Sequence, residues 1–492
     1  MNTAMRLHDL LAGYAAPNAH GEIVVRGLAI DSRQVQHGDA FFALQGGSDH
    51  GIRFADTAIR AGAAAIIAES CPDMDAGSVR EPVIWIDDLS QHLGPIAARF
   101  FGDASRTLQV TGVTGTNGKT STVQLLAQSL NHLGRRTATI GTLGAGLPES
   151  FSSGERTTPD AIQIQRLLVS FLDQGATDVA MEVSSHALEQ GRVNGIHFRV
   201  AVFTNLTRDH LDYHGNMEAY AAAKQKLFAM PALTVAVINT DDSFGRTLAA
   251  NLPAEMACIS YGMQESSAAV NAQDIETHAG GLRFLLRTPW GQGQVESSLL
   301  GRFNVANLLA VAASLGAMGY GFADIARALA TLEPVDGRMS RLGGSATQPL
   351  VVIDYAHTPD ALEQALVSLR QHCEGQLICV FGCGGERDVG KRPQMAAIAE
   401  RLADRVIVTD DNPRAEDGDA IVAAIMQGFE NPVGVAIQRD RGCAIHAAIH
   451  AARPDDIVLV AGKGHEPYQE VRGERLVFDD RDVARQALEA RS

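Results

Sequence analysis

Short apolar runs without interior proline recur along the chain, and amphipathic helical patterns separate them. The clearest runs lie at 108–113, 177–183, 200–206, 234–240, 350–356, 377–382, 406–410 and 457–463, and a loop rich in Gly, Asn, Asp or His follows each one. This alternation is typical of parallel sheets with crossover helices. In such sheets ligands bind beyond the carboxyl ends of the strands, so we expect the chemistry in the loops after these runs.

Two breaks in the pattern divide the chain into three predicted domains. Residues 103–107 lead from a helical stretch into a strand, and residues 336–349 are rich in Gly, Ser and Pro. We therefore expect an α/β protein with a smaller N-terminal α/β domain over 1–105, a central P-loop-type domain with a mostly parallel sheet over 106–338, and a C-terminal Rossmann-like domain over 339–492. A length of 492 residues is typical of about three domains.

Composition narrows the class of protein. The net charge of −16 argues against a general nucleic-acid binder, which would need a basic surface. Six cysteines without regular spacing indicate neither a disulfide scaffold nor a zinc site. No apolar stretch approaches the length of a membrane span, and the N-terminal apolar run is too short for a signal peptide. We therefore expect a cytoplasmic protein.

The segment 114–121 reads TGTNGKTS and carries the strongest local signal for chemistry. A strand precedes it, and a helix follows with apolar residues on one face up to Gly134, which is placed to end it. A Gly-rich loop between a strand and a helix N-terminus is an anion cradle. Lys119 would reach nucleotide phosphates and Thr120 would bind Mg²⁺. Val113 stands where the standard pattern has Gly, so an ordinary strand-to-helix turn is the alternative.

Eight further segments of the chain carry polar or glycine-rich motifs. They are EVSSHALEQGR (182–192), FTNLTRDHLDYHG (203–215), AYAAAKQKLF (219–228), GRFNVANLLA (301–310), DYAHTPDAL (354–362), GCGGERDVGKRP (382–393), DNPR (411–414) and GKGHE (462–466). With TGTNGKTS they make the chain resemble the Mur ligases, relatives of the folylpolyglutamate synthetases, over essentially its whole length. Within that family the chain is similar to the branch that adds 2,6-diaminopimelate.

The resemblance implies formation of an amide bond driven by ATP. The D-glutamate carboxylate of UDP-N-acetylmuramoyl-L-alanyl-D-glutamate would attack the γ-phosphate and form an acyl phosphate, which the amine of meso-diaminopimelate would then attack. The implied partners are small molecules (the UDP-linked muramoyl dipeptide, diaminopimelate and ATP with Mg²⁺), with no nucleic acid and no membrane span. The sequence leaves the oligomeric state open, and we expect a monomer.

The resemblance also assigns the ATP site and the catalytic residues. The ATP contacts would be Gly115, Thr116, Asn117, Gly118, Lys119, Thr120, Ser121, Asn304, Arg338 and Asp354. The catalytic residues would be Lys119, Lys224, Glu182 and His210, with Thr120, Glu182, His210 and a carbamylated Lys224 holding metal. From the residues alone, Lys224 is a surface lysine, Glu182 a solvated carboxylate at a strand end and His210 a hydrogen-bonding loop residue. Lys226 would point elsewhere on the helix.

Two further groups come from the same resemblance. The UDP-linked dipeptide would contact Ile30, Ser32, Gly47, Ser48, Asp49, Thr157, Thr158, Ser184, Gln190 and Arg192. Diaminopimelate would contact Arg387, Asp411, Asn412, Pro413, Arg414, Gly462 and Glu466. The simpler alternatives are two β-turns for the N-terminal segments, a helix N-cap for 157–158, a surface loop for Arg414 and a solvated charge cluster for Arg387. At the second boundary, Asp336 and Ser340 depart from the family pattern.

Arg414 is the residue that discriminates between relatives. Diaminopimelate has a second carboxylate that lysine lacks, and a guanidinium can bind that carboxylate through two hydrogen bonds. The rival within the superfamily adds lysine or glutamate, and folate ligases lack an N-terminal domain of this kind. A rival of another class is a protein that uses the phosphate loop as a nucleotide switch. Such a protein needs no set of Glu182, His210 and Lys224.

Overall fold

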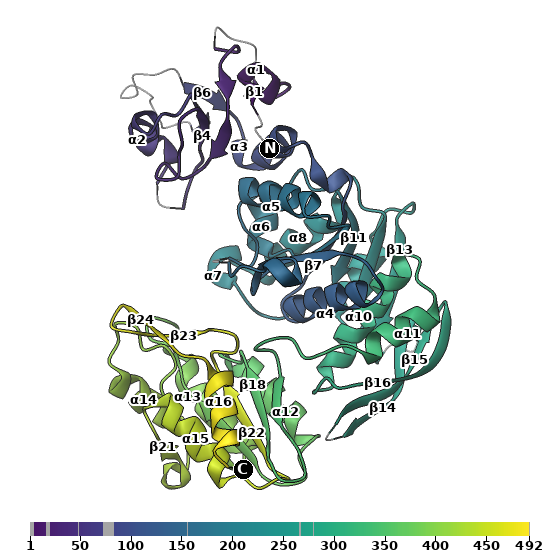
Figure 1. Cartoon of the computed structure of the whole chain (residues 1–492), viewed down its shortest axis with the longest axis vertical. Coiled ribbons are helices and arrows are strands. Elements are labelled where there is room, and N and C mark those ends of the chain that lie inside the picture. The colour runs from purple at the N-terminus through teal and green to yellow at the C-terminus, as the bar shows by residue number, and fades with distance from the viewer. Residues whose placement is uncertain are drawn as a thin grey trace. The chain divides into compact units, whose positions relative to one another are not determined.

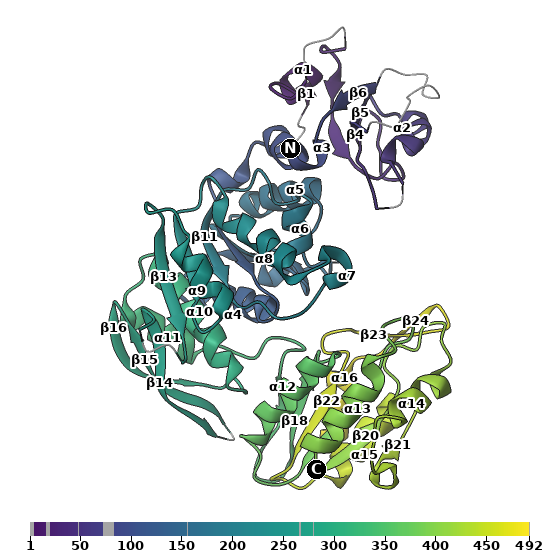
Figure 2. The ribbon, with the colours of Figure 1, turned by 180° about the vertical axis from the view of Figure 1, so that it is seen from behind.

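The computed structural model describes residues 4–15, 20–47, 49–71, 83–154, 156–264, 267–278 and 280–491. The chain divides into two compact units, Met1–Ala268 with Ala313–Tyr320, and Ala269–Ala312 with Gly321–Ser492. Figures 1 and 2 show the ribbon from opposite sides. Within the described ranges no helix has the length and apolarity that a membrane crossing requires. The division into three domains stays a prediction.

Unit 1 begins with a small parallel sheet in the order β3-β4-β5-β6. Its elements are β1 (Met5–Arg6), α1 (Leu7–Leu10), β2 (Val24–Val25), β3 (Gly27–Ala29), β4 (Asp39–Ala43), η1 (Gly51–Phe54), α2 (Ala55–Arg60), β5 (Ala65–Glu69), β6 (Val83–Ile86), α3 (Leu89–Phe101) and η2 (Ala104–Arg106). Phe42 packs in one apolar cluster with residues of α3, whereas the adjacent Phe41 packs in another with residues of α2. Because successive residues of a strand face opposite sides, the two helices cover opposite faces.

The larger sheet of unit 1 has the strand order β13-β12-β11-β7-β10-β8-β9. Its elements are β7 (Gln109–Thr114), α4 (Lys119–His132), β8 (Thr137–Gly141), β9 (Gly144–Gly146), η3 (Pro148–Ser150), α5 (Ala161–Asp173), β10 (Asp178–Glu182), α6 (Ser185–Glu189), β11 (Phe198–Phe203), α7 (Leu211–His214), α8 (Met217–Gln225), η4 (Lys226–Ala229), β12 (Val235–Asn239), α9 (Ser243–Ala250) and β13 (Ala257–Gly262). Only the β8–β9 pair among these is antiparallel in the described part.

The register of this sheet brings three strand ends together. Glu182 at the end of β10 pairs with Val113 of β7, and Phe203 at the end of β11 pairs with Thr114. The loops after all three strands therefore start at one edge of the sheet. The mostly parallel central sheet is the one that the sequence predicts.

Unit 2 begins with an antiparallel meander that the apolar runs do not predict. It consists of β14 (Val270–His278), β15 (Gly281–Thr288) and β16 (Gly291–Ser297). Helices α10 (Phe303–Ala317) and α11 (Phe322–Ala330) follow, and residues 313–317 of α10 belong to unit 1. Along the second half of β14 exposed residues alternate with half-buried ones. A strand with one solvent-exposed face has no continuous apolar run, so apolar runs do not predict β14.

The C-terminal part of unit 2 is a sheet in the order β17-β18-β22-β19-β20-β21. Its elements are β17 (Ser340–Gly343), β18 (Leu350–Asp354), α12 (Pro359–Arg370), β19 (Leu377–Phe381), α13 (Lys391–Leu402), β20 (Arg405–Val408), α14 (Gly418–Met426), η5 (Pro432–Gly434), β21 (Ala436–Ile437), α15 (Arg441–Ala451), β22 (Ile457–Ala461), β23 (Tyr468–Val471), β24 (Glu474–Val477) and α16 (Asp480–Glu489). Helices α12 to α14 share one apolar cluster and α15 and α16 another, so both faces are covered as in a Rossmann-like domain.

The second predicted boundary contains a strand that the sequence does not predict. The stretch 336–349 reads as a break, but it contains β17, which pairs antiparallel with β18. The short strand has no apolar run of its own, and its pairing with the buried β18 determines its conformation.

Candidate active site

The phosphate loop has the strand–loop–helix context that the sequence predicts. Gly115 has φ of 150° and Gly118 has φ of 84°, and Gly118 is the N-cap of α4. A Cβ on Gly115 would lie 1.9 Å from Thr204 Oγ1, so only glycine fits there. Lys119 Nζ donates to the carbonyl oxygens of Gly115 (3.0 Å) and Thr116 (2.8 Å). The loop is thus a cradle of the shape that phosphates require, with its lysine in place.

Glu182 is not the solvated carboxylate of the simpler alternative, since it is only 1% exposed. Thr120 Oγ1 donates to its Oε2 (3.0 Å), and Thr142 donates from its backbone N to Oε1 (2.7 Å) and from Oγ1 to Oε2 (3.2 Å). These bonds fix the carboxylate beside the first turn of α4. The Thr120 hydroxyl and the Glu182 carboxylate together offer the oxygen ligands that Mg²⁺ prefers.

Lys224 is not a surface lysine either. Its side chain on α8 is 1% exposed, and its Nζ donates to the carbonyl oxygen of Gly115 (2.7 Å) and lies 4.2 Å from the ring centroid of Tyr220. Burial, and then the charge of Lys119, hold the pKa of Lys224 well below its ordinary value of 10.5. Lys226 instead forms an exposed ion pair with Glu189 (2.8 Å). The structure therefore separates the two lysines as the sequence argument does.

His210 is exposed, and its ring lies near Tyr220, which contacts Lys224. It has φ of 53°, and its ring centroid lies 4.9 Å from that of His186 and 6.1 Å from that of Tyr220. The Tyr220 hydroxyl is in turn 3.2 Å from Thr116 Oγ1. Across the described residues, no three His, Cys, Asp or Glu side chains gather as a metal cage. The oxygen donors present fit Mg²⁺ held by one carboxylate, waters and phosphate.

The residues predicted to bind the dipeptide form one hydrogen-bonded network. Thr158 Oγ1 donates to the Glu182 carbonyl (2.8 Å) and accepts from Ser184 N (3.1 Å). Arg192 donates from Nη1 to the Thr158 carbonyl (3.0 Å) and from Nε to Gln190 Oε1 (2.9 Å). The network is therefore bonded to the backbone of Glu182.

Thr157, the other threonine predicted to bind the dipeptide, also lies close to Glu182. Thr157 Oγ1 lies 3.0 Å from Thr142 Oγ1, and Thr142 also bonds to Glu182. The N-cap of α5 is Asp160, which accepts from Gln163 N (2.9 Å), so residues 157–158 do not cap that helix. Burial lowers the pKa of Arg192, and the nearby Arg156 lowers it further.

The predicted N-terminal contacts follow two neighbouring parallel strands. Ile30 and Ser32 come after β3, and Gly47 and Asp49 come after β4, so both segments lie at one edge of the small sheet. Asp49 forms an exposed ion pair with Arg53 (2.5 Å). Ser48 lies outside the described residues.

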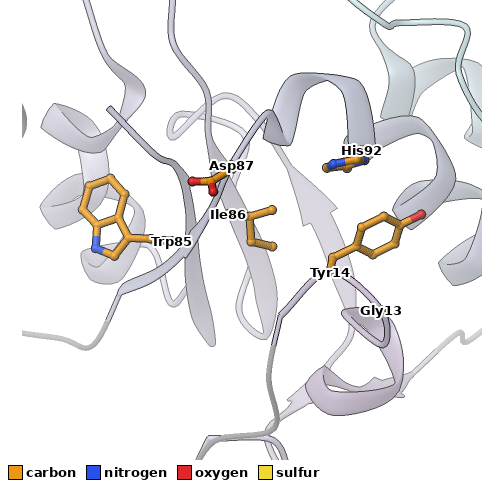
Figure 3. A pocket seen from close by; sticks show the side chains of 6 residues that line it. All are labelled: Gly13, Tyr14, Trp85, Ile86, Asp87 and His92. Atoms are coloured by element: carbon orange, nitrogen blue, oxygen red, sulfur yellow. The ribbon is translucent and has the colours of Figure 1, made fainter. Parts of the chain in front are cut away.

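A pocket that the sequence does not predict lies near the end of β6. Its volume is about 330 Å³, and its lining residues are Gly13, Tyr14, Trp85, Ile86, Asp87 and His92. In Figure 3, Tyr14 and His92 lie together on one side, whereas Trp85 points away from them. The side chains do not converge on one point, so we assign the pocket no ligand.

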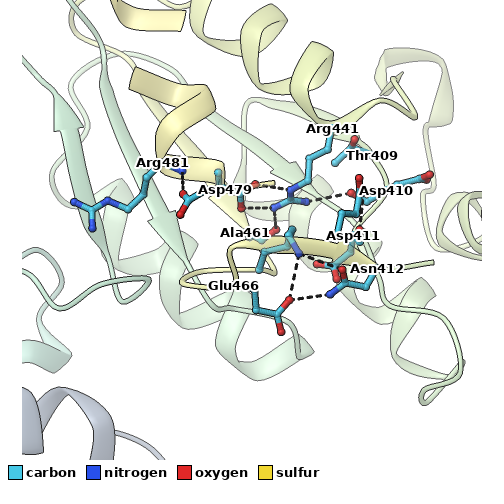
Figure 4. A network of polar contacts seen from close by, with 12 residues as sticks. Thr409, Asp410, Asp411, Asn412, Arg441, Ala461, Glu466, Asp479 and Arg481 are labelled. Atoms are coloured by element: carbon cyan, nitrogen blue, oxygen red, sulfur yellow. Dashed lines mark hydrogen bonds and ion pairs between the residues drawn. The ribbon is translucent and has the colours of Figure 1, made fainter. Parts of the chain in front are cut away.

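In unit 2 the ends of four neighbouring strands carry the predicted residues. Asp354 ends β18, and Gly462, Arg387 and Asp411 follow β22, β19 and β20. Gly462 has φ of 119°, and a Cβ there would lie 2.4 Å from Asp411 Oδ2. Asn412 Nδ2 donates to Glu466 Oε2 (2.8 Å), as Figure 4 shows. The loops after β20 and β22 are therefore joined directly.

Two buried cations hold these loops, and neither is predicted from the sequence. Lys463 is 0% exposed, and its Nζ donates to Asn412 Oδ1 (3.1 Å) and Glu466 Oε2 (3.2 Å). Arg441 donates to both carboxylate oxygens of Asp480 (2.7 Å each) and to the Ala461 carbonyl (3.0 Å). Burial raises the pKa of Asp411 against the opposing effect of Arg441.

Arg414 is half-buried and held in place, not a free surface residue. Its Nη1 donates to the Gly385 carbonyl (2.7 Å), and its Nε lies 3.4 Å from Glu470 Oε2. A Cβ on Gly384 would lie 2.9 Å from Arg414 Nη1 and 3.8 Å from Arg387 Cγ, so the two arginines flank the same glycine. Arg387 is exposed, and Pro413 is buried.

The three other predicted ATP contacts also lie in unit 2. Asn304 Nδ2 donates to the Leu300 carbonyl (2.7 Å), and Arg338 lies 4.8 Å from the ring centroid of Tyr355. Asp354 Oδ2 accepts from Met339 N (2.8 Å), and burial raises the pKa of Asp354 while Arg338 opposes that rise. The buried Nε of Arg338 has no hydrogen-bond partner in the described part of the chain.

Comparison with known proteins gives matches along the whole chain. Three family models match, described as Mur ligase family, catalytic domain (residues 24–101), Mur ligase middle domain (113–315) and Mur ligase, glutamate ligase domain (337–464). A relative from Xanthomonas campestris pv. campestris, named UDP-N-acetylmuramoyl-L-alanyl-D-glutamate–2,6-diaminopimelate ligase, is 55% identical and covers 99% of this chain and 98% of its own. The chain belongs to the Mur ligase family.

Other proteins similar to this Mur ligase are also named as Mur ligases. A Pseudomonas aeruginosa protein of the same name is 50% identical over 96% of this chain and 97% of its own. A solved structure of a ligase of that name matches with a TM-score of 0.75 and 38% identity, and covers 99% of both chains. The Thermotoga maritima MurF ligase in complex with ADP shares the fold, with a TM-score of 0.62, 20% identity and coverage of 95% and 99%.

Membership settles the class of reaction. Mur ligases form amide bonds with the consumption of ATP, and this chain is such an enzyme. The loop at 114–121 has the strand–loop–helix geometry of a phosphate site, and its contact with ATP stays a prediction. The nucleotide switch is wrong as a description of the whole chain.

Proposed function

We propose that this Mur ligase joins meso-2,6-diaminopimelate to the D-glutamate of UDP-N-acetylmuramoyl-L-alanyl-D-glutamate, which extends a peptidoglycan precursor by one residue. The names of relatives at 50–55% identity support this substrate pair. The observation that carries it is the fixed Arg414 guanidinium, which flanks Gly384 together with Arg387. A guanidinium held in this way can bind the far carboxylate of diaminopimelate, which lysine does not have.

The first step is activation of the D-glutamate carboxylate. The phosphate loop, through its backbone N–H groups and Lys119, binds the triphosphate and orients the γ-phosphorus toward the acceptor. The network of Thr157, Thr158, Ser184, Gln190 and Arg192 adjoins Glu182 and would hold the dipeptide there. A carboxylate oxygen attacks the γ-phosphorus, the bond to the bridging oxygen breaks, and ADP leaves as the acyl phosphate forms.

Bound Mg²⁺ would neutralise the charge that accumulates on the phosphates. Thr120 and Glu182 are placed to hold one ion, and Lys224 as a carbamate, with His210 at the rim, would supply further ligands. Carbamate formation requires a neutral amine, and the depressed pKa of Lys224 provides it. Ser121, Asn117 and Gly118 complete the loop, and Asn304, Arg338 and Asp354 would contact the rest of the nucleotide.

The second step is capture of the acyl phosphate by an amine. Asp411, Asn412, Pro413, Arg414, Arg387, Gly462 and Glu466 would orient diaminopimelate so that one neutral amine reaches the acyl carbon. Attack gives a tetrahedral intermediate, which expels inorganic phosphate and leaves the amide. We place the reaction in the cytoplasm, where ATP and UDP-linked precursors occur, and propose that the protein acts as a monomer. The UDP end of the substrate would contact Ile30, Ser32, Gly47, Ser48 and Asp49.

A panel of amino acids at fixed ATP and fixed UDP-linked dipeptide tests the proposal. Phosphate release should require both co-substrates and should be fastest with meso-diaminopimelate, with lysine and ornithine far slower. The tripeptide product should appear by mass spectrometry in equal amount to the phosphate. Preference for lysine, or phosphate release that ignores both co-substrates, would refute the assignment.

A further inference from the structure

A second cavity lies at the opposite edge of the central sheet from the phosphate loop. Its volume is about 500 Å³, and its lining residues are Gln109, Thr111, Arg135, Asp178, Arg199, Val200, Thr234, Ala317, Met318 and Tyr320. Gln109 and Asp178 are the first residues of β7 and β10, and Arg199 is the second residue of β11. Ligands of parallel sheets bind at the carboxyl ends of strands, so this amino-end cavity is separate from the site of the reaction.

The charges of this amino-end cavity leave one cation unpaired. Arg135 Nε pairs with Asp178 Oδ2 (2.7 Å), and Thr177 Oγ1 donates to the same oxygen (2.6 Å), so the Asp178 carboxylate is neutralised. The exposed guanidinium of Arg199 has no ion pair or hydrogen bond to any described residue. The net charge of the lining is therefore positive, and the planar guanidinium matches a carboxylate.

A hydroxyl on β7 also opens into this cavity without a partner in the described part of the chain. Thr111 is 2% exposed as a residue and lines the cavity, and its Oγ1 forms no hydrogen bond with any described residue. An unpaired hydroxyl that opens into a cavity can bond to a ligand atom or to water. Val200, Ala317 and Met318 form an apolar wall beside it.

We propose that the amino-end cavity binds a small organic carboxylate, with its anionic group on Arg199 and Thr111 and its apolar body against Val200 and Met318. The volume is within the range of small-molecule sites. Three elements connect this cavity to the reaction site: β7 leads to the phosphate loop, β10 leads to Glu182, and α4 begins at Lys119 and ends three residues before Arg135. The cavity therefore has a direct structural path to the ATP-binding residues.

Binding of 4-fluorobenzoate, measured by ¹⁹F NMR on the full chain, tests this proposal. Saturating Mg²⁺ and ADP occupy the phosphate loop, so that the probe cannot bind there. We expect saturable binding that Arg199→Gln weakens at least tenfold and Thr111→Val, which keeps the side-chain shape, at least threefold. Arg287→Gln removes an exposed arginine of β15 and should leave binding unchanged.

Each contrary outcome overturns the proposal. Absence of saturable binding refutes the site, and so does equal affinity in the wild type and Arg199→Gln. Loss of binding in Lys119→Ala would place the probe in the phosphate loop. Displacement of the probe by inorganic phosphate at equal concentration would refute recognition of an organic acid. Circular dichroism of each variant establishes that it folds.

Discussion

Lys119 and Lys224 donate to the same atom, the carbonyl oxygen of Gly115, at 3.0 and 2.7 Å. The two amines come from the first turn of α4 and the end of α8, and the second is almost completely buried. Two neighbouring ammonium groups repel each other, which favours the neutral form of the more buried one. The position of Lys224 beside Lys119 thus favours the neutral amine that the proposed carbamate would require.

Replacement of Lys224 by alanine should abolish ligation. If its carbamate holds metal, the variant loses an anionic oxygen ligand, and we expect a decrease in kcat of at least about a hundredfold, comparable to removal of one electrostatic group at a reaction centre. Added short-chain carboxylates should restore part of the rate. The matched control is Lys226→Ala, which removes an exposed lysine two positions away and should keep near-normal activity.

Lys224 should also make stability depend on pH. Its pKa in the folded chain is well below the ordinary 10.5, so between these two values the unfolded chain binds more protons than the folded one. The free energy of unfolding should therefore rise with pH across this interval in CO₂-free buffer. In Lys224→Met the slope should be smaller, while Lys226→Met should keep it. An unchanged slope in Lys224→Met would contradict the depressed pKa.

Arg414→Lys should separate recognition of diaminopimelate from recognition of ATP. The lysine keeps the charge but loses the planar pair of donors. Loss of a charged hydrogen bond is worth about 1.5–3 kcal/mol, so KM for diaminopimelate should rise about ten- to hundredfold while KM for ATP stays within about twofold. Equal changes in both constants, measured by phosphate release, would show that the variant acts through the fold and not through the amino acid.

Lys463→Met should destabilise the C-terminal sheet. The substitution removes the cation that contacts Asn412 and Glu466 and leaves the Glu466 carboxylate without it. Removal of one partner of a buried ion pair costs about 3–5 kcal/mol, so the urea midpoint should fall clearly. Adding Glu466→Gln should recover part of the loss, because the unpaired charge is then gone. No recovery in the double variant would show that the pair is not coupled.

The fold could be predicted wherever burial leaves a continuous apolar run. The runs at 177–183 and 350–356 correspond to β10 and β18, because strands buried on both faces are largely apolar. Strands β14 to β16 and β17 could not be found in this way, since they alternate or are too short. Their conformation depends on partners elsewhere in the chain.

The site residues also differ in whether neighbouring positions in the sequence are enough to predict them. The phosphate loop is local, so its glycines and Lys119 could be identified from adjacent residues. The burial of Lys224 depends on Gly115, which is 109 positions away, and no pattern within α8 reveals it. Lys463 stands inside GKGHE and could have been noticed, but its role requires Asn412, which is 51 positions away.

The loop carbonyls that accept from Lys119 and Arg414 have a consequence for selectivity. Each of these two cations already has an oxygen partner within its own loop or the loop beside it. An arriving anion must displace that oxygen and not merely bulk solvent, so it is bound only if it offers several well-placed acceptors at once. We therefore expect chloride and other simple ions to gain little from such an exchange, whereas a triphosphate or an amino-acid carboxylate would gain enough to complete it.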